Sequence, residues 1–483
     1  MPQTPKLMYN YRGVYHRDLT HEVAYYAGKY TGEYYRMRSG VTTPLCLVAN
    51  DHRFSSNSIK HYVCQGLIEA GCQVVDNGCL PTSVASYCIR KRADGGVVVT
   101  ASHNPPEHNG LKFFDSTGGV LKPHVEEVLI AKVLAQVAKD DTIPHRLITR
   151  GYALQGPEDV MELYISDVER TITLQHSLRV AVDCRFGTAY TIMPQLLERL
   201  GCEAALLHGQ LHPYFIKSNG DYLNPEPKES NIGEIRRFIG SGTYDVGLIF
   251  DGDSDRNVIV DDKGTYVTDD TVLLLLALEY ADRAKPVAVT IDTALMVEQV
   301  LRKEGFELLV TPVGDPFIAQ ALEDTDASFG GVPNGHYIFP DFNLYSDGIY
   351  SAAVMLRLVA KLKSQGTTLS EFVGTLPPGY ILKAKHPFGQ SRAAFHAEVA
   401  PRVRDLIARH CNQIDDRQTD DCVVTGRSDH CKLLVRYNRW DNNFNVQAES
   451  LESAGHAQEL QDSLMSLLGS ICTNASTKAR TNA

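Results

Sequence analysis

A serine and a histidine follow a run of valines near residue 100, in the stretch GGVVVTASHNPPEHNGLKFF (residues 95–114). The glycine pair and three valines predict a buried strand, which the two prolines and the polar residues after Ala101 should end. Held outward by such a loop, Ser102 could act as a nucleophile, with His103 or Lys112 as base or charge stabiliser. From this loop alone, a polar turn in which Ser102 and Asn104 satisfy backbone groups is an equal alternative.

Three aspartates alternate at the end of a second apolar run, in DVGLIFDGDSDRN (residues 245–257). The side chains of Asp251, Asp253 and Asp255 can converge on one cation. A calcium-binding EF-hand loop starting at Asp251 would need Gly and Glu where Arg256 and Asp262 stand, and it would follow a helix. A Mg²⁺ site with an adjacent arginine for phosphate fits better. The alternative is a solvated acidic turn, although three unpaired carboxylates would repel one another.

A third polar stretch, SFGGVPNGHYIFP (residues 328–340), holds two glycine-rich turns and ends at His336. Alone it predicts a hairpin or a crossover turn.

Strand-like and helix-like runs alternate around these motifs and indicate βαβ units with mainly parallel sheets. The first round covers residues 44–104, the second 177–256 and the third 285–332. Prolines and glycines at residues 376–389 predict a linker, and a helix, short strands and a last helix follow it. We therefore expect three consecutive α/β domains at residues 1–150, 151–265 and 266–375, and a smaller α+β domain at 376–483.

Composition excludes several classes of function. The formal charge of −11 argues against a nucleic-acid or anionic-membrane surface. The longest apolar run, at residues 271–281, is too short to span a bilayer and predicts a buried helix. The N-terminus shows no signal-peptide pattern, and eleven cysteines without a CxxC pair suggest reduced thiols in the cytoplasm. No GxGxxG follows a first strand, which argues against an oxidoreductase.

Taken together, the motifs resemble the α-D-phosphohexomutase family of phosphoglucomutases and phosphomannomutases. The resemblance covers residues 8–375 and continues more weakly to the end. It includes YNYRGVYHRDLTHEVAYYAGKY, TASHNPPEHNGLKFF, DGDSDR, TPVGDPFI, FGGVPNGHYIFP and SDGIYSAA, in that order.

The resemblance implies four domains around a central cleft and a phosphosugar mutase reaction. Ser102 would carry a phosphoryl group and, with Asp251, Asp253 and Asp255, bind Mg²⁺. The residues implied around the transferring phosphate are Arg12, His103, Lys112 and Arg256. A bisphosphorylated sugar is the implied activator, and the partner is a small phosphorylated substrate, with no nucleic acid or membrane. The protein would be a monomer or a dimer.

Two loops depart from the family pattern. The family's third-domain loop reads GGExSGH, and here Gly331 and His336 remain while Val332 and Asn334 replace the glutamate and serine. A valine cannot accept a hydrogen bond from a sugar hydroxyl, a loss of about 1 to 3 kcal/mol.

The family's fourth-domain phosphate loop, RxSGTEPxxR, falls on VRYNRWDNN. It keeps Arg436 but places Asn438, Arg439 and Trp440 where small residues would wrap a phosphate. Arg436 and Arg439 could still bind an anion, and Trp440 could stack on a ring or pack as core.

These departures predict a mutase for an atypical phosphorylated sugar. A one-way phosphotransferase or phosphatase on a small metabolite, and a non-catalytic mutase-like binding protein, remain the alternatives.

Overall fold

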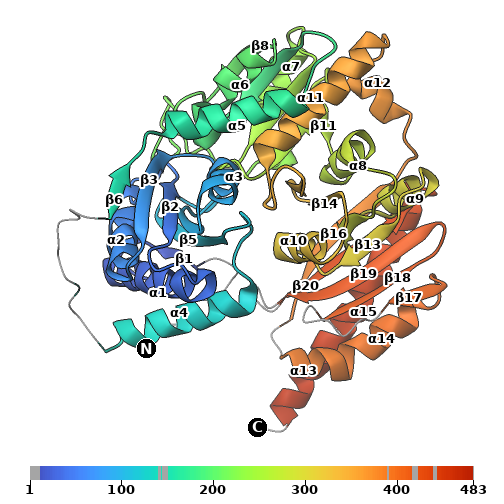
Figure 1. Ribbon diagram of the computed structural model, residues 1–483. Helices are drawn as coiled ribbons and strands as arrows, with labels where there is room; N and C mark the ends of the chain where they lie inside the picture. Colours follow the sequence, from blue (N-terminus) through green and yellow to red (C-terminus); the bar gives the residue numbers. More distant parts are fainter. Residues whose placement is uncertain are drawn as a thin grey trace. The chain divides into compact units, whose positions relative to one another are not determined.

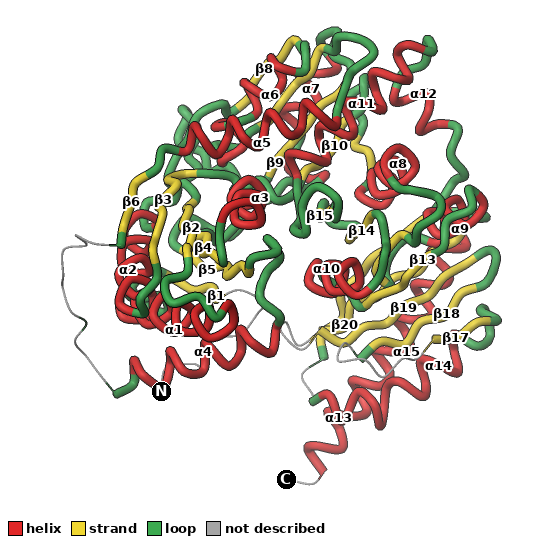
Figure 2. The backbone as a smooth tube through the Cα atoms, in the orientation of Figure 1, coloured by secondary structure: helices red, strands yellow, loops and turns green. Residues whose placement is uncertain are grey.

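The protein, as a computed structural model, is described for residues 11–139, 143, 151–388, 391–415, 422–438 and 443–481, with side chains as far as residue 472. It divides into two compact units. One contains Met1–Ala288 and Ile318–Gly374, and the other contains Val289–Phe317 and Thr375–Ala483. Four sheets follow one another along the chain (Figure 1), and helices alternate with strands in the first three (Figure 2).

The first sheet has six strands in the order β1-β5-β4-β2-β3-β6. The four consecutive strands β4, β2, β3 and β6 are parallel to one another, whereas β5 is antiparallel to both β4 and β1. The elements are β1 (Tyr11–Val14), α1 (His21–Ser39), β2 (Leu45–Asn50), α2 (Ser56–Glu69), β3 (Gln73–Cys79), α3 (Thr82–Arg92), β4 (Gly95–Val99), β5 (His108–Asp115), α4 (Pro123–Val137) and β6 (Tyr152–Leu154).

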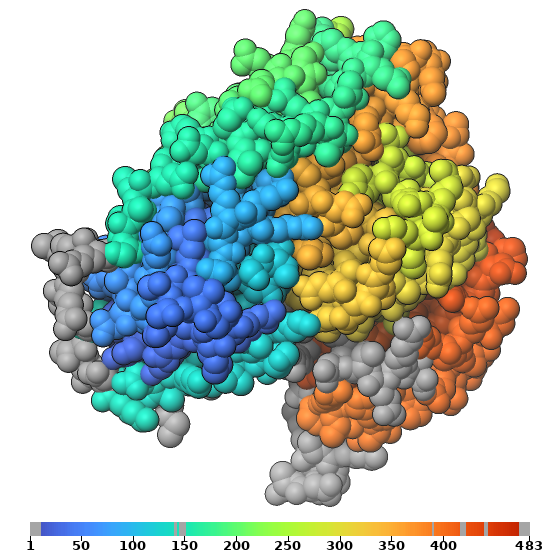
Figure 3. All heavy atoms as spheres, viewed as in Figure 1, coloured from blue at the N-terminus to red at the C-terminus, as the bar shows by residue number. Residues whose placement is uncertain are grey.

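The second sheet has the order β11-β10-β9-β7-β8 and places the end of β9 directly before the three aspartates. Its elements are α5 (Pro157–Thr171), β7 (Arg179–Asp183), α6 (Met193–Arg199), β8 (Glu203–Leu207), α7 (Gly233–Gly240), β9 (Val246–Phe250), β10 (Asn257–Val260) and β11 (Tyr266–Val267). A 3₁₀ turn at Thr188–Thr191 precedes α6, and Pro194 lies in the first turn of α6, where a proline is tolerated. In Figure 3 this domain (green) and the first (blue) form a continuous surface.

The third sheet, of order β13-β12-β14-β15, is where the chain passes between the two units. Residues 329–338 form a β14–β15 hairpin, as expected. All of the run at 271–281 except Ala281 lies in α8, whose residues from Asp270 to Ala277 are buried, as expected. The elements are α8 (Asp269–Tyr280), β12 (Val287–Thr290), α9 (Leu295–Lys303), β13 (Leu308–Thr311), α10 (Asp315–Asp324), β14 (Phe329–Val332), β15 (His336–Ile338), α11 (Gly348–Ser364) and α12 (Leu369–Gly374).

The fourth sheet has the order β16-β20-β19-β18-β17 and is antiparallel throughout. The expectation of a linker at 376–389 is wrong, because β16 occupies most of it and pairs with β20 along its whole length. β16 is an edge strand, where Pro387 removes no necessary ladder hydrogen bond. The elements are β16 (Tyr380–Pro387), α13 (Arg392–Ala394), α14 (Ala400–Ile407), β17 (Gln413–Asp415), β18 (Val423–Arg427), β19 (Cys431–Asn438), β20 (Asn443–Ser450) and α15 (Ala454–Thr481).

The fold class is therefore the expected one, three α/β domains with mixed sheets and a β-rich α+β domain at the C-terminus. None of the helices within the described residues has the length and apolar character that crossing a bilayer requires.

Candidate active site

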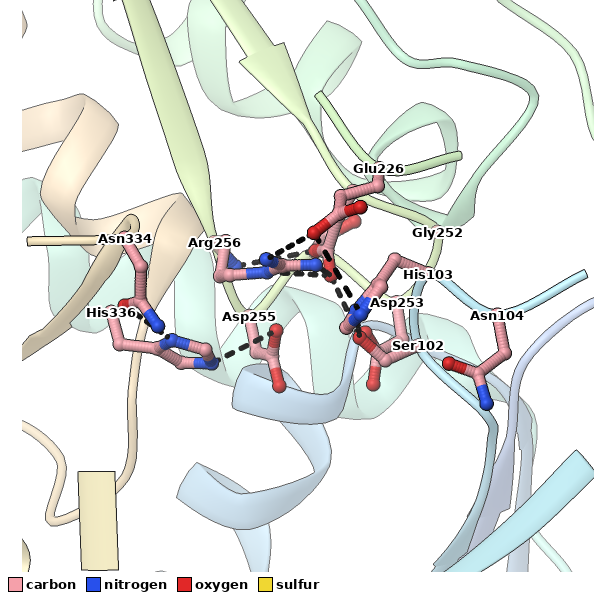
Figure 4. A network of polar contacts seen from close by, with 12 residues as sticks. Ser102, His103, Asn104, Glu226, Gly252, Asp253, Asp255, Arg256, Asn334 and His336 are labelled. Atoms are coloured by element: carbon pink, nitrogen blue, oxygen red, sulfur yellow. Dashed lines mark hydrogen bonds and ion pairs between the residues drawn. The ribbon is translucent and has the colours of Figure 1, made fainter. Parts of the chain in front are cut away.

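Ser102 lies in the turn between β4 and β5, beyond the buried end of a strand. Its backbone adopts a left-handed conformation (φ 52°), which is strained for a residue with a side chain by about 1 to 3 kcal/mol. Its Oγ donates a hydrogen bond to Asp251 Oδ2 (2.9 Å) and lies 3.0 Å from His103 Nδ1. The structure thus brings the serine loop and the aspartate loop together, across 149 residues of sequence (Figure 4).

Arg53, which the sequence analysis missed, holds this turn in place. Its guanidinium donates hydrogen bonds to four backbone carbonyls of the turn, those of Ser102 (2.8 Å), Asn104 (2.7 Å), Pro105 (2.6 Å) and His108 (3.2 Å). Its Nε donates to Asp51 Oδ2, which also accepts a hydrogen bond from Thr100. The signal was available, since an aspartate and an arginine directly follow the second strand at the same edge of the sheet.

The three aspartates after β9 converge on one point. One ligand oxygen from each of Asp251, Asp253 and Asp255 lies within 4.8 Å of the other two, and the residues are 0 to 2% exposed. Two of the six oxygens, Asp253 Oδ1 and Asp255 Oδ1, are buried without a hydrogen-bond partner among the described residues. A solvated acidic turn is excluded, because these carboxylates are buried.

Lys112 in β5 lies directly against this cluster. Its buried Nζ donates to Asp253 Oδ2 (2.8 Å), Asp255 Oδ2 (2.7 Å) and Tyr345 OH (2.8 Å). Burial disfavours the charged lysine, but Asp253 and Asp255 outweigh this and raise its pKa. Although burial also favours a neutral Asp255, Lys112 and His336 hold the pKa of that carboxyl below its usual range.

Arg256 is the second cation at the cluster. Its Nε donates to Asp251 Oδ2 (3.1 Å), and its Nη2 forms an ion pair with the same oxygen, also at 3.1 Å. Burial, followed by the Asp255 carboxylate, nevertheless raises the pKa of Asp251. Two cations thus face three carboxylates, and a divalent cation would supply the missing positive charge. The unpartnered carboxylate oxygens fit Mg²⁺, which prefers oxygen ligands.

Two glycines allow these loops to approach one another. A Cβ at Gly252 would lie 2.6 Å from the Ser102 carbonyl oxygen, so a side chain there would displace the serine turn. Gly335, in the β14–β15 turn, has φ 90°, and a Cβ there would lie 3.2 Å from Arg256 Cβ. The third-domain hairpin therefore reaches the aspartate loop through a residue that must be glycine.

The hairpin places His336 and Asn334 beside the cluster (Figure 4). His336 Nε2 lies 3.8 Å from Asp255 Oδ1, and its Nδ1 lies 2.9 Å from Asn334 Oδ1. Val332 is paired with His336 and is buried, and Gly331 is paired with Tyr337. The side chain at position 332 is therefore part of the core of the domain, whereas Asn334 is exposed.

Arg12 and His103 complete the polar surroundings of Ser102. Arg12 pairs with Gly110 between β1 and β5, and its Nε is buried without a hydrogen-bond partner among the described residues. Burial, then the charges of Arg256 and Arg12, lower the pKa of His103 well below its usual value. His103 is accordingly a neutral imidazole at neutral pH, able to exchange a proton with Ser102.

Glu226 is a further residue that the sequence analysis missed. Its Oε1 lies 3.7 Å from Arg256 Nη1 and 3.9 Å from His103 Nε2, and Figure 4 shows it above both. Its Oε2 lies 2.6 Å from the exposed Lys228. The loop after β8 that carries Glu226 has no strong sequence pattern, so nothing singled it out.

The fourth-domain candidates belong to the other compact unit. Arg436 and Asn438 lie in β19. Arg436 pairs with Val423 on one side and Asn445 on the other, and Asn438 pairs with Asn443. Arg439 and Trp440 lie outside the described residues.

Three family models match the chain in order along its length. They are phosphoglucomutase/phosphomannomutase α/β/α domain I at residues 8–140, domain II at 162–264 and domain III at 268–380. A probable phosphoglucosamine mutase from Methanopyrus kandleri is 31% identical over 465 residues, which cover 95% of this chain and 96% of that protein. A phosphoglucomutase/phosphomannomutase from Thermococcus kodakarensis is 30% identical, over 80% of this chain and 84% of that protein.

Solved structures share the fold. A phosphoglucomutase/phosphomannomutase family protein from Burkholderia thailandensis has a TM-score of 0.79 at 24% identity, covering 96% of both chains. The structure of a protein from Thermus thermophilus described as a putative phosphomannomutase has a TM-score of 0.74 at 21% identity. This match covers 97% of this chain and 100% of that one. The matching domains, the relatives and the order of the serine, aspartate and hairpin loops agree, and the chain belongs to the α-D-phosphohexomutase family of phosphosugar mutases.

Proposed function

We propose that the protein is a Mg²⁺-dependent phosphosugar mutase that transfers phosphoryl groups through a phosphoserine at Ser102, on a sugar phosphate that its altered hairpin selects. The observation that carries the proposal is the 2.9 Å contact of Ser102 Oγ with the buried aspartate cluster. Phosphoryl transfer requires mainly positioning and charge neutralisation, and these residues supply both.

The proposed reaction moves one phosphoryl group out and one back. A sugar hydroxyl oxygen attacks the phosphorus of phospho-Ser102, a new P–O bond forms, and the bond to Ser102 Oγ breaks. The proton of the sugar hydroxyl passes to Ser102 Oγ, and His103, which lies within hydrogen-bond distance of this oxygen, can relay it. The bisphosphorylated sugar then reorients, and Ser102 recovers a phosphoryl group from its other end. A bisphosphorylated sugar would also prime the enzyme.

The cations around Ser102 stabilise the phosphoryl group during transfer. Arg12 Nε is a buried donor without a hydrogen-bond partner among the described residues, and it could bind a phosphoryl oxygen. Arg256, paired with Asp251 and 3.7 Å from Glu226, would supply a second positive charge. Asp251, Asp253, Asp255 and Ser102 would hold Mg²⁺, which supplies electrostatic stabilisation of the phosphoryl oxygens. Lys112 fixes the orientation of two of these carboxylates.

The substrate is proposed to differ from common hexose phosphates in the group that the hairpin contacts. Val332 is buried in the domain core, and the Oδ1 of Asn334 is engaged by His336, which leaves the amide nitrogen of Asn334 as a donor. The site therefore favours a substrate with a hydrogen-bond acceptor at the position that Asn334 faces. Because several relatives are named phosphoglucosamine mutases, glucosamine phosphate is the first candidate, followed by glucose and mannose phosphates.

Peptide mapping after incubation with glucose 1,6-bisphosphate tests the proposal. We expect the peptide containing Ser102 to gain one phosphoryl group. With Mg²⁺ present, we expect the enzyme to convert the 1-phosphate of glucosamine, glucose or mannose into the 6-phosphate. Ser102→Ala should abolish both, whereas Ser116→Ala, at an exposed position of the same domain, should change neither. A Ser102 that never carries phosphate contradicts the proposal.

The altered fourth-domain loop favours a second candidate, one-way phosphoryl transfer or hydrolysis. The replacement of small residues by Asn438, Arg439 and Trp440 removes a grip on the second phosphate. Release of inorganic phosphate without formation of the positional isomer would support this candidate over the mutase.

We also propose a cytoplasmic location, in agreement with eleven free thiols.

A further inference from the structure

Two cysteine thiols of the fourth domain are in contact. Cys411 Sγ and Cys431 Sγ lie 4.0 Å apart, although 20 residues separate them in the sequence. Both residues are buried, at 6% and 3% exposure, and both belong to the same compact unit. A disulfide has an S–S distance of about 2.05 Å, so about 2 Å of sulfur movement separates this pair from a covalent bond.

The backbone around the pair holds the two residues in place. Cys411 follows α14 and packs over Gly426, where a Cβ would lie 3.0 Å from Cys411 Cβ. Cys431 is the first residue of β19, and Ser428 N donates to its carbonyl (2.8 Å) while its own N donates to Ser428 Oγ (3.1 Å). With the backbone held in this way, we expect the sulfurs to reach bonding distance by rotation of the side chains about their Cα–Cβ bonds.

The two thiols have different chemical environments. A hydrogen bond from Cys411 lowers the pKa of Cys431, although burial acts in the opposite direction. A second hydrogen bond from Ser428, whose Oγ lies 3.2 Å from Cys431 Sγ, lowers it further. The same sulfur–sulfur hydrogen bond raises the pKa of Cys411. Because the thiolate is the reactive form of cysteine and the Ser428 hydroxyl lies within hydrogen-bond distance of the Cys431 sulfur, we assign Cys431 as the nucleophile of the pair and Cys411 as the resolving thiol.

A cavity lies beside residues that adjoin the two cysteines, neither of which is among its lining residues. It has a volume of about 280 Å³, and its lining includes Asn412, Gln413 and Ser428. Asn412 follows Cys411 directly, and Ser428 contacts Cys431. A cavity of this size admits a molecule as small as hydrogen peroxide. The nearby Cys422 faces elsewhere, with its sulfur 3.5 Å from His396 Nε2.

We propose that Cys411 and Cys431 form a thiol–disulfide modification site that reacts with hydroperoxides. The Cys431 sulfur attacks the O–O bond of hydrogen peroxide; an S–O bond forms, the O–O bond breaks, and hydroxide leaves as water once protonated. The Cys411 sulfur then attacks the resulting sulfenic acid; the S–S bond forms, the S–O bond breaks, and the second oxygen leaves as water. Two thiols lose two electrons and two protons, and one peroxide becomes two waters.

The disulfide would tie the end of α14 to the β18–β19 hairpin. It closes a loop of 20 residues that includes the edge strand β17. Such a cross-link restricts the unfolded chain, so the oxidised protein should unfold at a higher temperature than the reduced one. This site lies outside the aspartate and serine loops and does not depend on the proposed phosphoryl transfer.

Tryptic mapping of the intact protein tests the proposal directly. Cleavage places Cys411, Cys422 and Cys431 on three separate peptides, residues 410–417, 418–427 and 428–432. After treatment with hydrogen peroxide and alkylation of free thiols with N-ethylmaleimide, we expect peptides 410–417 and 428–432 to be recovered linked. Their mass should be two hydrogens below the sum, and dithiothreitol should separate them.

Two variants and an internal standard make the result decisive. Cys422→Ser should leave the linked species unchanged, whereas Cys411→Ser should leave a Cys431 sulfenic acid that dimedone traps. Met37, at 78% exposure, reports the peroxide dose through its sulfoxide. Recovery of both cysteines as alkylated thiols from protein whose Met37 is oxidised would overturn the proposal. A link from either residue to Cys422 would overturn it as well.

Discussion

Replacing Arg53 with lysine should loosen the serine turn without removing the buried positive charge. The arginine satisfies four carbonyl oxygens of the turn and also contacts Asp51. A lysine ammonium has three protons. If one serves Asp51, two remain, and two of the four carbonyls lose their partner.

The size of the effect follows from this count. Each lost hydrogen bond contributes about 1 to 1.5 kcal/mol, which gives about 2 to 3 kcal/mol for the variant. If that energy falls on the turn, the population with Ser102 correctly placed drops roughly 30- to 160-fold. We therefore expect kcat/KM to fall within this range, and the unfolding free energy in urea to fall by a similar amount.

The assay is mutase turnover with the best sugar phosphate, together with the rate at which Ser102 becomes phosphorylated. Arg17→Lys is the matched control, because Arg17 is exposed and, among the described residues, its guanidinium forms an ion pair with the neighbouring Asp18 alone. Wild-type values of both kcat/KM and stability for Arg53→Lys would refute the conclusion that Arg53 positions the serine turn.

Three further substitutions probe other parts of the structure. Gly252→Ala should lower kcat at least tenfold while urea unfolding changes less, because its Cβ would lie 2.6 Å from the Ser102 carbonyl; equal losses in both would show a general destabilisation. Glu226→Gln should strengthen inhibition by inorganic phosphate about fivefold, since about 1 kcal/mol of competing attraction for Arg256 is removed; weaker inhibition would show that Glu226 is needed to place Arg256. Burial lowers the pKa of His52 to about 4, so the unfolded chain binds the extra proton first and stability falls as pH drops from about 6.5 to 4. His52→Phe should flatten this slope between pH 7 and 4 in urea titrations, and an unchanged slope would assign it to other groups.

Much of the site could be predicted because its residues lie in local sequence patterns. The valine run before Ser102 and the alternating aspartates after β9 each indicate a strand end with polar groups beyond it. The structure brings these two loops together with Lys112, Arg256 and His336. The contact between the two loops depends on the tertiary structure, and only the family resemblance predicted this contact.

The remaining site residues gave weak local signals. Arg53 acts on the carbonyls of another loop, and a single arginine in the sequence does not reveal which backbone groups it satisfies. Glu226 belongs to a long loop without regular periodicity. In both cases the function of the side chain depends on contacts between segments that are about 30 or more residues apart.

The errors in secondary structure also have physical reasons. Proline and glycine around residues 377–389 predicted a linker, but the strand β16 lies at a sheet edge, where proline is tolerated. β5 begins at the polar residues His108 and Asn109 because β1 offers them a partner on the other side. Pairing with a distant strand overrides local propensity here.

The position of Lys112 has a consequence for synthesis of the chain on the ribosome. Its first carboxylate partner, Asp253, emerges 141 residues later, which at 5 to 20 residues per second corresponds to roughly 7 to 28 s. During this time the first domain carries an ammonium group on its inner face that has no carboxylate to neutralise it. We therefore expect Lys112 of the first domain, expressed alone, to react with amine-specific reagents, and to lose this reactivity when the second domain is supplied.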